Sequence, residues 1–351
     1  MARCLFIVQG EGKGHMSQAL ALKEYLHEAG HTVDAVLLGI RSPDAVPEYF
    51  KNVFSDSLHT YSGPWFLRTP NKKGIYVGRT ILYNLTRSLV YFKAIGRIRK
   101  LIKVTRPDVI FNFYELLGAL AMRKTAPGIK IIGIGHHFYL YLNSSLCKSG
   151  PAWHRFLLKM HTSMILNSCS RVMALSFRKE PGSDKIQVVP PLIRKEFREM
   201  SYVPGDRYLV YLLQEGFFYE LVQLARNNPG FKADLFTSLN PEIEIPAGIR
   251  LHPFDAKKFS NLMASCKGLI CTAGFDTAAE AACQGIPLVV IPSQNHFEQR
   301  CNGEDIMANG IGLTASRIDQ GVVDQMKAWN SREYRAWVNL AGEEIIKCIQ
   351  E

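Results

Sequence analysis

A short glycine-rich turn near the start of the chain combines an acid, a lysine and a histidine in the order Gly10-Glu11-Gly12-Lys13-Gly14-His15. It follows an apolar run at residues 4–10 and precedes a helical pattern of apolar residues that begins near Ser17. Backbone N–H groups at the start of a helix attract anions, and the missing side chains let a ligand come close. The turn is therefore predicted either to contact a ligand or to serve as a plain strand-to-helix connection.

His15 is the most specific residue of this turn. An imidazole at the tip of a glycine-rich turn can deprotonate an acceptor hydroxyl or hold a phosphate. The alternative is a histidine that caps the helix and has no chemical role. Gly12, Lys13 and Gly14 are predicted to contact the acceptor or a phosphate. The dinucleotide-binding fingerprint matches this turn loosely, since its glycines alternate and no acid follows the next strand.

A second motif stands where a buried strand ends at Gly274 and a helix of small residues, 275–285, begins. Thr272, Ala273 and Gly274 are predicted to present amides to a diphosphate, and the helix dipole adds about half a positive charge. Glu280, one turn into that helix, can accept hydrogen bonds from both hydroxyls of a ribose. The alternative for Glu280 is an ordinary solvated helix residue.

A polar loop, residues 292–302, follows the next strand and runs into a helix. Polar groups at the carboxyl end of a strand can bind sugar hydroxyls and hold a leaving phosphate. The polar side chains that can make such contacts are His296, Glu298, Gln299 and Asn302. The position of the loop, directly after the glycine and glutamate motif, makes this prediction more specific than the loop alone would.

The elements that must position these motifs alternate between short apolar strands and helices, a pattern that predicts parallel sheets in an α/β fold. In the first half of the chain, strands are predicted at residues 4–10, 32–39, 108–113, 130–138, 171–177 and 186–193. In the second half, they are predicted at residues 208–213, 232–238, 249–254, 268–274, 287–293 and 311–315. Ligands of open α/β sheets bind outside the carboxyl ends of the strands, so a site is expected in a cleft between the two halves.

A charged stretch at residues 194–207 separates the two halves and predicts two doubly wound, Rossmann-like domains. Residues 1–194 and residues 207–330 are the expected two domains. Residues 331–351 are predicted to form a helix that packs back on the first domain. A length of 351 residues with 47% hydrophobic composition agrees with two domains.

The composition also predicts where the protein works. The first residues resemble a buried strand without a cleavage site, and no apolar run is long enough to span a bilayer. The eight cysteines form no CxxC pair and no ligand spacing with the ten histidines, so neither a zinc site nor a disulfide framework is indicated. We therefore expect a cytoplasmic protein, either free or peripheral on the inner face of the cytoplasmic membrane.

The run of residues 271–292, CTAGFDTAAEAACQGIPLVVIP, resembles the donor motif of the GT-B glycosyltransferases. The resemblance is strongest to the MurG-like branch, which transfers N-acetylglucosamine to a lipid-linked acceptor, and UDP-glucuronosyltransferase-like enzymes share it more distantly. It extends over residues 269–315 and includes the turn at residues 10–15. The resemblance implies two Rossmann-like domains that face each other across a cleft, with a C-terminal helix crossing back to the first domain. Residues 1–194 would bind the acceptor, and residues 207–330 would bind the nucleotide sugar.

The resemblance also implies roles for single residues. Gly274 and its neighbours would contact the donor diphosphate, and Glu280 the ribose. Glu298 and Gln299 would contact the donor sugar, and His296 and Asn302 of the same loop would also contact the donor. His15 would lie beside the acceptor as a base or a phosphate clamp. The strand-end residues that would frame the uracil are His252, Pro253 and Phe254.

The sequence departs from the family pattern in two turns. Residues 213–216, Leu-Gln-Glu-Gly, contain one glycine and an acid where the family has a glycine-rich loop, which argues against phosphate contact there. Lys13 interrupts the glycine doublet of the first turn and can supply a charge contact instead. The family offsets the leaving diphosphate with helix dipoles and side chains, and no DxD motif stands near a strand end. We expect no metal and no other cofactor, with a UDP-sugar as substrate.

A basic segment, residues 57–107, can account for the whole formal net charge of +11, because it holds eleven Lys or Arg and no acid. One helical face of this segment carries the apolar residues Ile81, Leu82, Leu85, Leu89 and Phe92. Residues 65–106 could therefore bind an anionic membrane surface. Alternatively, the helix packs on the sheet and its charges are solvated. Nucleic acid is not the expected partner, since no recognition motif accompanies the charge.

Further candidates for the acceptor site come from three other positions. His136 and His137, at the end of the strand predicted at 130–138, are acceptor contacts or simply hydrogen-bonded residues. Glu11 and Glu115 are alternatives to His15 as the base.

The predicted reaction is transfer of a hexose or N-acetylhexosamine from a UDP-sugar to a hydroxyl of an acceptor, either lipid-linked or an anionic envelope glycan. His15 would deprotonate this hydroxyl, and the amides near Gly274 would stabilise the departing diphosphate. One alternative is a UDP-sugar epimerase, which would need several acids around the sugar where the two loops offer few. Another is a non-catalytic nucleotide-binding or membrane-docking subunit.

Overall fold

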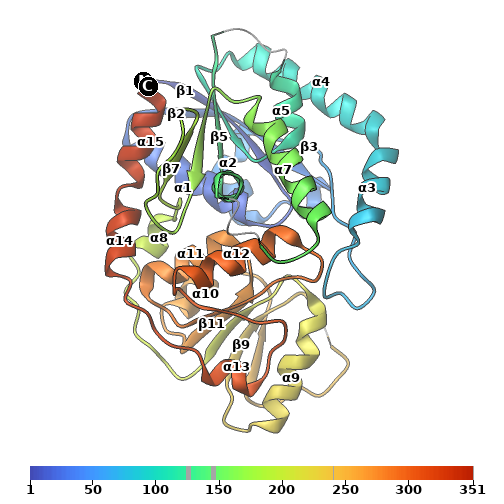
Figure 1. Cartoon of the computed structure of the whole chain (residues 1–351), viewed down its shortest axis with the longest axis vertical. Coiled ribbons are helices and arrows are strands. Elements are labelled where there is room, and N and C mark those ends of the chain that lie inside the picture. The colour runs from blue at the N-terminus through green and yellow to red at the C-terminus, as the bar shows by residue number, and fades with distance from the viewer. Residues whose placement is uncertain (124–127, 144–147, 240, 351) are drawn as a thin grey trace. The chain divides into compact units, whose positions relative to one another are not determined.

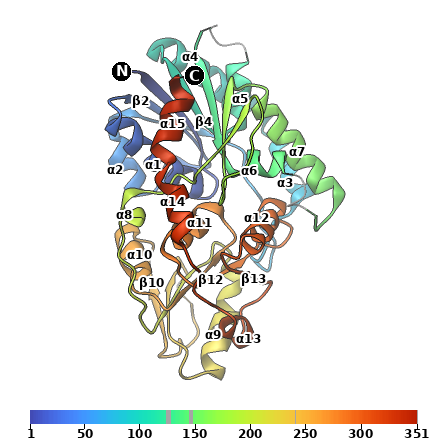
Figure 2. The same cartoon turned by 60° about the vertical axis from the view of Figure 1, so that its left-hand side comes forward.

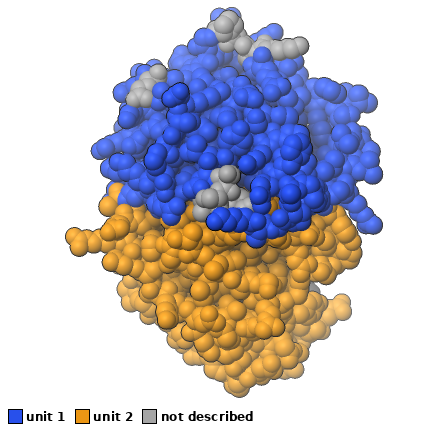
Figure 3. All heavy atoms as spheres, in the orientation of Figure 1, with its two compact units in different colours: residues 1–67, 77–194, 337–351 blue, residues 68–76, 195–336 orange. Residues whose placement is uncertain are grey.

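The computed structural model describes residues 1–123, 128–143, 148–239 and 241–350, and the chain divides into two compact units (Figures 1 and 3). Unit 1 comprises residues 1–67, 77–194 and 337–351, and unit 2 comprises residues 68–76 and 195–336. The units differ from the predicted domain ranges in three segments that belong to unit 2, residues 68–76, 195–206 and 331–336. Both units are α/β, as the alternation of strands and helices predicted.

Unit 1 is built on a parallel sheet with the strand order β3-β2-β1-β4-β5-β6-β7. The strands are β1 (Arg3–Gln9), β2 (Thr32–Ile40), β3 (Leu58–Ser62), β4 (Val109–Phe113), β5 (Lys130–Gly135), β6 (Arg171–Leu175) and β7 (Ile186–Val189). β1 pairs with β2 and β4, and its residues Leu5, Phe6 and Ile7 are fully buried. A parallel sheet covered on both faces has no solvent side, so its central strand is a continuous apolar run.

The helices of unit 1 connect these strands and cover the sheet. They are α1 (Gly14–Glu28), α2 (Glu48–Phe54), α3 (Val77–Thr86), α4 (Ser88–Thr105), α5 (Leu116–Met122), α6 (His136–Leu142), α7 (Ala152–Leu166) and α15 (Ala341–Gln350), with short 3-10 turns at Pro43–Ala45 and Ser55–Ser57. Buried side chains of α4 and α5 pack on the face of the sheet that carries Leu5 and Ile7. Helix α1 packs against α2 and α15, and Figure 2 shows α15 lying beside α1.

All twelve predicted strands are present in the described part of the chain, but two predictions in unit 1 need correction. The predicted strand at 130–138 ends at Gly135, and His136 and His137 are the first residues of α6. The apolar run continues past the strand because α6 is itself buried, from His136 to Leu140. The sequence also missed β3, which pairs in parallel with β2, because its residues LHTYS lack an apolar run.

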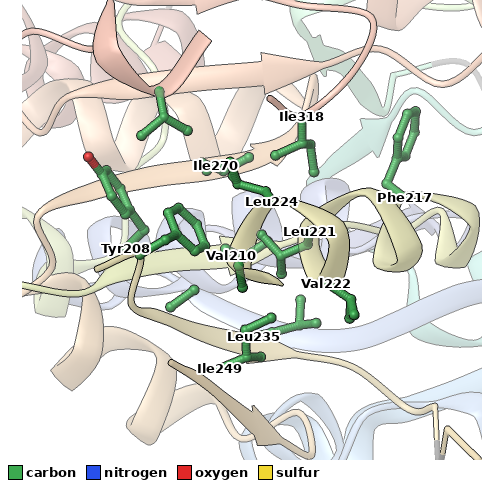
Figure 4. Close-up of a cluster of buried hydrophobic side chains, with 14 of the residues drawn as sticks. Tyr208, Val210, Phe217, Leu221, Val222, Leu224, Leu235, Ile249, Ile270 and Ile318 are labelled. Atoms are coloured by element: carbon green, nitrogen blue, oxygen red, sulfur yellow. The ribbon is translucent and has the colours of Figure 1, made fainter. Parts of the chain in front are cut away.

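Unit 2 is built on a second parallel sheet with the strand order β10-β9-β8-β11-β12-β13. Its strands are β8 (Tyr208–Tyr211), β9 (Ala233–Phe236), β10 (Ile249–His252), β11 (Gly268–Thr272), β12 (Leu288–Ile291) and β13 (Leu313–Thr314). Its helices are α8 (Lys195–Arg198), η4 (Glu215–Phe217), α9 (Phe218–Asn227), α10 (Ala256–Met263), α11 (Phe275–Gln284), α12 (Phe297–Ala308) and α13 (Gln320–Asp324). Figure 4 shows part of the core, in which Val210, Leu221 and Ile270 meet between α9 and the sheet.

The C-terminal residues form two helices, α14 (Arg332–Asn339) and α15, where the sequence predicted one. Residues 337–351 belong to unit 1, as the predicted return of the chain to the first domain requires. The indole N–H of Trp337 donates to the carbonyl of Ser176 (3.0 Å), and Nζ of Lys130 donates to the carbonyl of Ile349 (2.7 Å). Within the residues described, none of the helices has the length and apolar character that crossing a membrane requires.

Candidate functional site

The first group of candidate residues lies in unit 2, at the carboxyl ends of the adjacent strands β8, β11 and β12. Gly274 is the N-cap of α11, and the nearest described atom that a Cβ on it would meet is the Thr272 carbonyl oxygen, 3.9 Å away. The space beside this glycine is therefore open to a ligand. The N–H groups of Ala273 and Gly274 donate to the carbonyls of Ile291 (3.3 Å) and Thr272 (2.6 Å).

The backbone N–H groups of Ala273 and Gly274 therefore stabilise the turn itself. They were predicted to bind a diphosphate instead. The N–H groups of the first turn of α11 have no acceptors within the helix, and the N-cap Gly274 supplies no side-chain cap. The hydroxyl of Thr272 accepts from the N–H of Leu213 (2.8 Å) and so ties the end of β11 to the turn after β8.

Glu280 lies in the middle of α11 and is 4% exposed. It is therefore not a solvated helix residue, which was the alternative to a ligand role. Burial of a carboxylate is costly unless polar groups compensate it. The neighbouring positions Ala278, Ala279, Ala281 and Ala282 are buried as well, so α11 packs closely within unit 2.

The predicted loop after β12 is tied to the start of α11 by Asn302. This fully buried side chain donates from Nδ2 to the carbonyl of Ala273 (3.0 Å), while its Oδ1 makes no hydrogen bond to the described residues. Oε1 of Gln299 accepts from the N–H of Ser293 (2.8 Å), and Nδ1 of His296 caps α12 by accepting from the N–H of Gln299 (3.4 Å). Three of the residues predicted to bind the sugar donor, His296, Gln299 and Asn302, therefore make hydrogen bonds that stabilise the loop and its neighbours.

Aromatic side chains gather at the end of β10. The ring of Phe254 is 37% exposed and lies 5.5 Å from the ring of Tyr211, measured between centroids. Nε2 of His252 is bonded to Oδ1 of Asp234 (2.7 Å), whose other oxygen accepts from Nε of Arg207 (2.7 Å). Burial alone would raise the pKa of Asp234, but the hydrogen bonds from His252 and Arg207 outweigh it and hold that pKa below the usual value. His252 is thus engaged inside unit 2, while the side chain of Phe254 is partly exposed.

The second group of candidate residues lies in unit 1, at the carboxyl ends of β1, β4 and β5. The ring of His15 lies 5.7 Å from that of His137, and His137 stacks on Tyr114 with 3.6 Å between ring centroids. The ring of His161 on α7 lies 5.0 Å from Tyr114, whose hydroxyl is 2.6 Å from Oγ1 of Thr162. We call His15, Tyr114, His137 and His161 the ring cluster.

Helix α1 begins at Gly14, earlier than predicted, so His15 lies in its first turn and Lys13 is the N-cap. His15 does not cap the helix but pairs through Nδ1 with Oε1 of Gln18 (3.3 Å). Gly12 adopts a left-handed backbone conformation (φ +76°), which explains a glycine at this position. Burial lowers the pKa of Lys13 to about 8, and an anion bound beside the ammonium would raise this pKa again.

The remaining candidates of unit 1 have structural partners. Nδ1 of His136 bonds to the carbonyl of Leu175 (2.8 Å), so of the two predicted histidines His137 alone belongs to the ring cluster. Oε1 of Glu11 accepts from the N–H of Phe66 (2.9 Å). Glu115 caps α5 through the N–H of Gly118, and burial raises its pKa from 4.5 to about 7.

Sequence reasoning missed Tyr114 and His161. Tyr114 directly follows β4 and has a left-handed backbone (φ +54°), which is uncommon for a residue with a side chain. Its position after a strand was the available signal. His161 lies within a helix far along the chain, and no local pattern distinguishes it.

Two α/β units with parallel sheets, a helix N-terminus at the end of β11 and a histidine turn at the end of β1 define a glycosyltransferase of the GT-B type. The chain belongs to glycosyl transferase family 1, whose model matches residues 2–328. An uncharacterized glycosyltransferase of Methanosarcina mazei is 24% identical over 336 residues, which cover 90% of this chain and 86% of that protein.

Solved structures share the fold. UGT2 of Phytolacca americana, complexed with UDP-2-fluoro-glucose and pterostilbene, superposes with a TM-score of 0.59 at 14% identity, covering 100% of this chain and 93% of that one. MurG of Acinetobacter baumannii gives 0.53 at 16% identity, covering 99% and 94%. The UDP-GlcNAc 2-epimerase of Neisseria meningitidis, bound to UDP-GlcNAc, gives 0.55 at 12% identity, covering 99% of each chain.

Proposed function

We propose that this protein transfers a hexose or N-acetylhexosamine from a UDP-sugar to an acceptor hydroxyl. The observation that carries the proposal is the start of α11, where open space beside Gly274 adjoins a helix N-terminus and the buried Asn302 ties the sugar loop to it. A helix N-terminus favours a diphosphate, and buried polar atoms such as Oδ1 of Asn302 favour a polar ligand. The Phytolacca and Neisseria proteins, which share the fold, are named with UDP-sugars.

In the proposed reaction, the acceptor oxygen attacks the anomeric carbon of the sugar while the bond from that carbon to the UDP oxygen breaks. His15 takes the hydroxyl proton, and the departing diphosphate carries the negative charge away. The dipole of α11 stabilises this charge as it develops. Glu280 would hold the ribose and Phe254 the uracil, whereas Glu298 and Gln299 would contact the sugar.

A thermal-shift panel of UDP, ADP, GDP and TDP tests the donor proposal. A ligand that binds only the folded state raises the apparent melting temperature, by an amount that grows with concentration over Kd. We expect UDP to give the largest shift, and Glu280→Gln to reduce it. Equal or absent shifts for all four nucleotides would refute the nucleotide site.

A UDP-sugar epimerase is the second candidate, because epimerases share the fold. Within the loop at residues 292–302, Glu298 is the one acid in the sequence, and proton abstraction from a sugar carbon followed by reprotonation calls for more. Incubation of UDP-N-acetylglucosamine without an acceptor separates the two reactions. We expect the sugar to remain unchanged, and conversion to a second UDP-sugar would favour the epimerase.

The acceptor is proposed to be lipid-linked and reached at an anionic membrane surface. The predicted apolar face does not pack on the sheet: Leu82 is 64%, Leu85 65% and Leu89 75% exposed. Another face of α4, which includes Ile95 and Ile98, fills the core instead. Exposed basic residues accompany the open face, at Arg79, Lys93, Arg97, Lys100, Lys103 and Arg106.

This combination of exposed leucines and basic side chains suits the headgroup region of an anionic bilayer. Sedimentation with phosphatidylglycerol vesicles, against phosphatidylcholine vesicles, tests it. The double variant Leu85→Ser with Leu89→Ser should lose most binding, whereas Val104→Ser, equally exposed on α4, should retain it. Equal binding of both variants to both vesicles would refute the surface.

A further inference from the structure

A short segment from the first half of the chain, residues 68–76, lies in unit 2, although the residues on either side of it belong to unit 1. We call it the strap. An antiparallel bridge between Arg68 and Ile75 folds the strap on itself, and a parallel bridge joins its Gly74 to Gln294. Nothing in the sequence pattern marked the strap, since it lies within the basic segment between predicted helices and strands.

One side of the strap holds the turn after β8. The carbonyl of Lys72 accepts from the N–H of Gly216 (3.2 Å), and Nζ of Lys72 pairs with Oε2 of Glu215 (2.7 Å). Nζ of Lys73 pairs with Oε1 of Glu220, the other oxygen of which accepts from the N–H of Ile318 (2.8 Å).

The other side of the strap holds the loop after β12. The carbonyl of Lys73 accepts from the N–H of Gln294 (2.8 Å), and the N–H of Ile75 donates to the carbonyl of Gln294 (3.0 Å). Nδ2 of Asn71 also donates to Oε1 of Gln294 (3.3 Å). Gln294 belongs to the loop that is proposed to contact the donor sugar.

The order of the strands shows what lies between these two attachments. β8 and β12 are the two neighbours of β11, which ends at Gly274 and the start of α11. The carbonyl of Lys72 accepts a hydrogen bond from the turn after β8, and the next carbonyl, that of Lys73, accepts one from the loop after β12. Neighbouring strands lie about 4.8 Å apart, so β8 and β12 are roughly 10 Å apart on either side of β11, and the strap joins the loops that follow them.

The strap also explains why residue 216, in the turn after β8, is a glycine. A Cβ on Gly216 would lie 2.2 Å from the carbonyl oxygen of Asn71 and 2.5 Å from Cγ of Lys73. The missing side chain of Gly216 therefore makes room for the strap. Lys72, in turn, balances the charge of Glu215, the acid that distinguishes this turn from a phosphate-binding loop.

We propose that the strap is a positioning element of the donor site. It fixes the turn after β8 and the loop after β12 at the separation that admits the donor diphosphate, and Lys72 offsets the carboxylate of Glu215 that would otherwise repel the donor. This inference rests on the proposed UDP-sugar site.

The first experiment compares Gly216→Ala with Gly230→Ala, a control in unit 2 where a Cβ meets no described atom within 4 Å. Binding of UDP is measured by calorimetry, and donor and acceptor KM by steady-state kinetics. We expect Gly216→Ala to raise Kd for UDP and donor KM about tenfold, with acceptor KM unchanged, and Gly230→Ala to alter neither. Wild-type affinity in Gly216→Ala would overturn the proposal.

The second experiment needs no change in backbone packing. Lys72→Ala should weaken UDP binding several-fold, and the added change Glu215→Gln should restore it, with the melting temperature nearly constant because an exposed ion pair contributes little to stability. Absence of rescue by Glu215→Gln would refute the charge-balancing role. Failure of the wild type to bind UDP would refute the proposed function instead, so the two proposals fail by different results.

Discussion

The candidate residues of the two units are held in place by different forces. In unit 2, the loops around the start of α11 are fixed by hydrogen bonds, from Asn302 to Ala273, from Ser293 to Gln299 and from Leu213 to Thr272. In unit 1, contacts between rings join the ring cluster: Tyr114 stacks on His137, and His161 lies at a tilt to Tyr114 with 5.0 Å between the ring centroids.

This difference matches two kinds of chemistry. A diphosphate is best stabilised by dipoles that do not move when charge develops, and a network of buried hydrogen bonds provides such rigidity. Proton transfer instead needs a group whose charge can change near neutral pH, and imidazole is that group. We therefore expect substitutions in unit 1 to act on turnover and its pH dependence, and substitutions in unit 2 to act on donor affinity.

The largest effect is expected for His15→Ala. Loss of a general base lowers the rate of the chemical step about 10²–10⁴-fold, while Kd for UDP should not change. The measurement is kcat together with UDP calorimetry, and His27→Ala, exposed in the last turn of the same helix, is the control. A kcat within twofold of the wild type would show that His15 is not the general base. It would also contradict the expectation that unit 1 controls turnover and unit 2 controls donor affinity.

A smaller effect, of the opposite kind, is expected for Glu280→Gln. Hydrogen bonds to a charged group contribute about 1.5–3 kcal/mol, so donor KM should rise roughly 10–100-fold with a much smaller change in kcat. Glu333→Gln, at an exposed position of unit 2, serves as the control. If kcat fell while donor KM stayed constant, Glu280 would belong to the chemistry and not to binding.

The smallest effect on turnover, but a distinct one on stability, is expected for Glu115→Gln. Burial raises the pKa of Glu115 to about 7 from 4.5, so between these values the folded protein retains a proton that the unfolded chain has lost. Stability should therefore fall as pH rises from about 4.5 to 7, by about 3 kcal/mol, and level off above.

Glutamine does not titrate, yet its amide oxygen can still cap α5, so Glu115→Gln should remove this part of the pH dependence. Melting temperatures of both proteins from pH 5 to 8 provide the measurement, with Glu48→Gln, exposed on α2, as the control. Parallel curves for Glu115→Gln and the wild type would contradict the assignment.

The sequence predicted the fold well where local patterns carry it. Strands such as β1 and β11 are buried apolar runs, and the motif from Cys271 to Pro292 identified the family by itself. The prediction failed where local patterns mislead. The apolar run through His136 and His137 continued from a strand into a buried helix, and β3 lacked a run altogether.

For the candidate site, the sequence alone determined the histidine turn, the start of α11 and the polar loop after β12, because each is continuous in the chain and carries its own signature of glycines and polar residues. Tertiary structure decided which residues join them. It brought Tyr114 beside His15 and His161 beside Tyr114, exposed the leucines of α3 and α4, and joined the loops after β8 and β12 through the strap. These contacts join residues distant in the chain, and no local pattern of hydrophobicity or backbone preference encodes them.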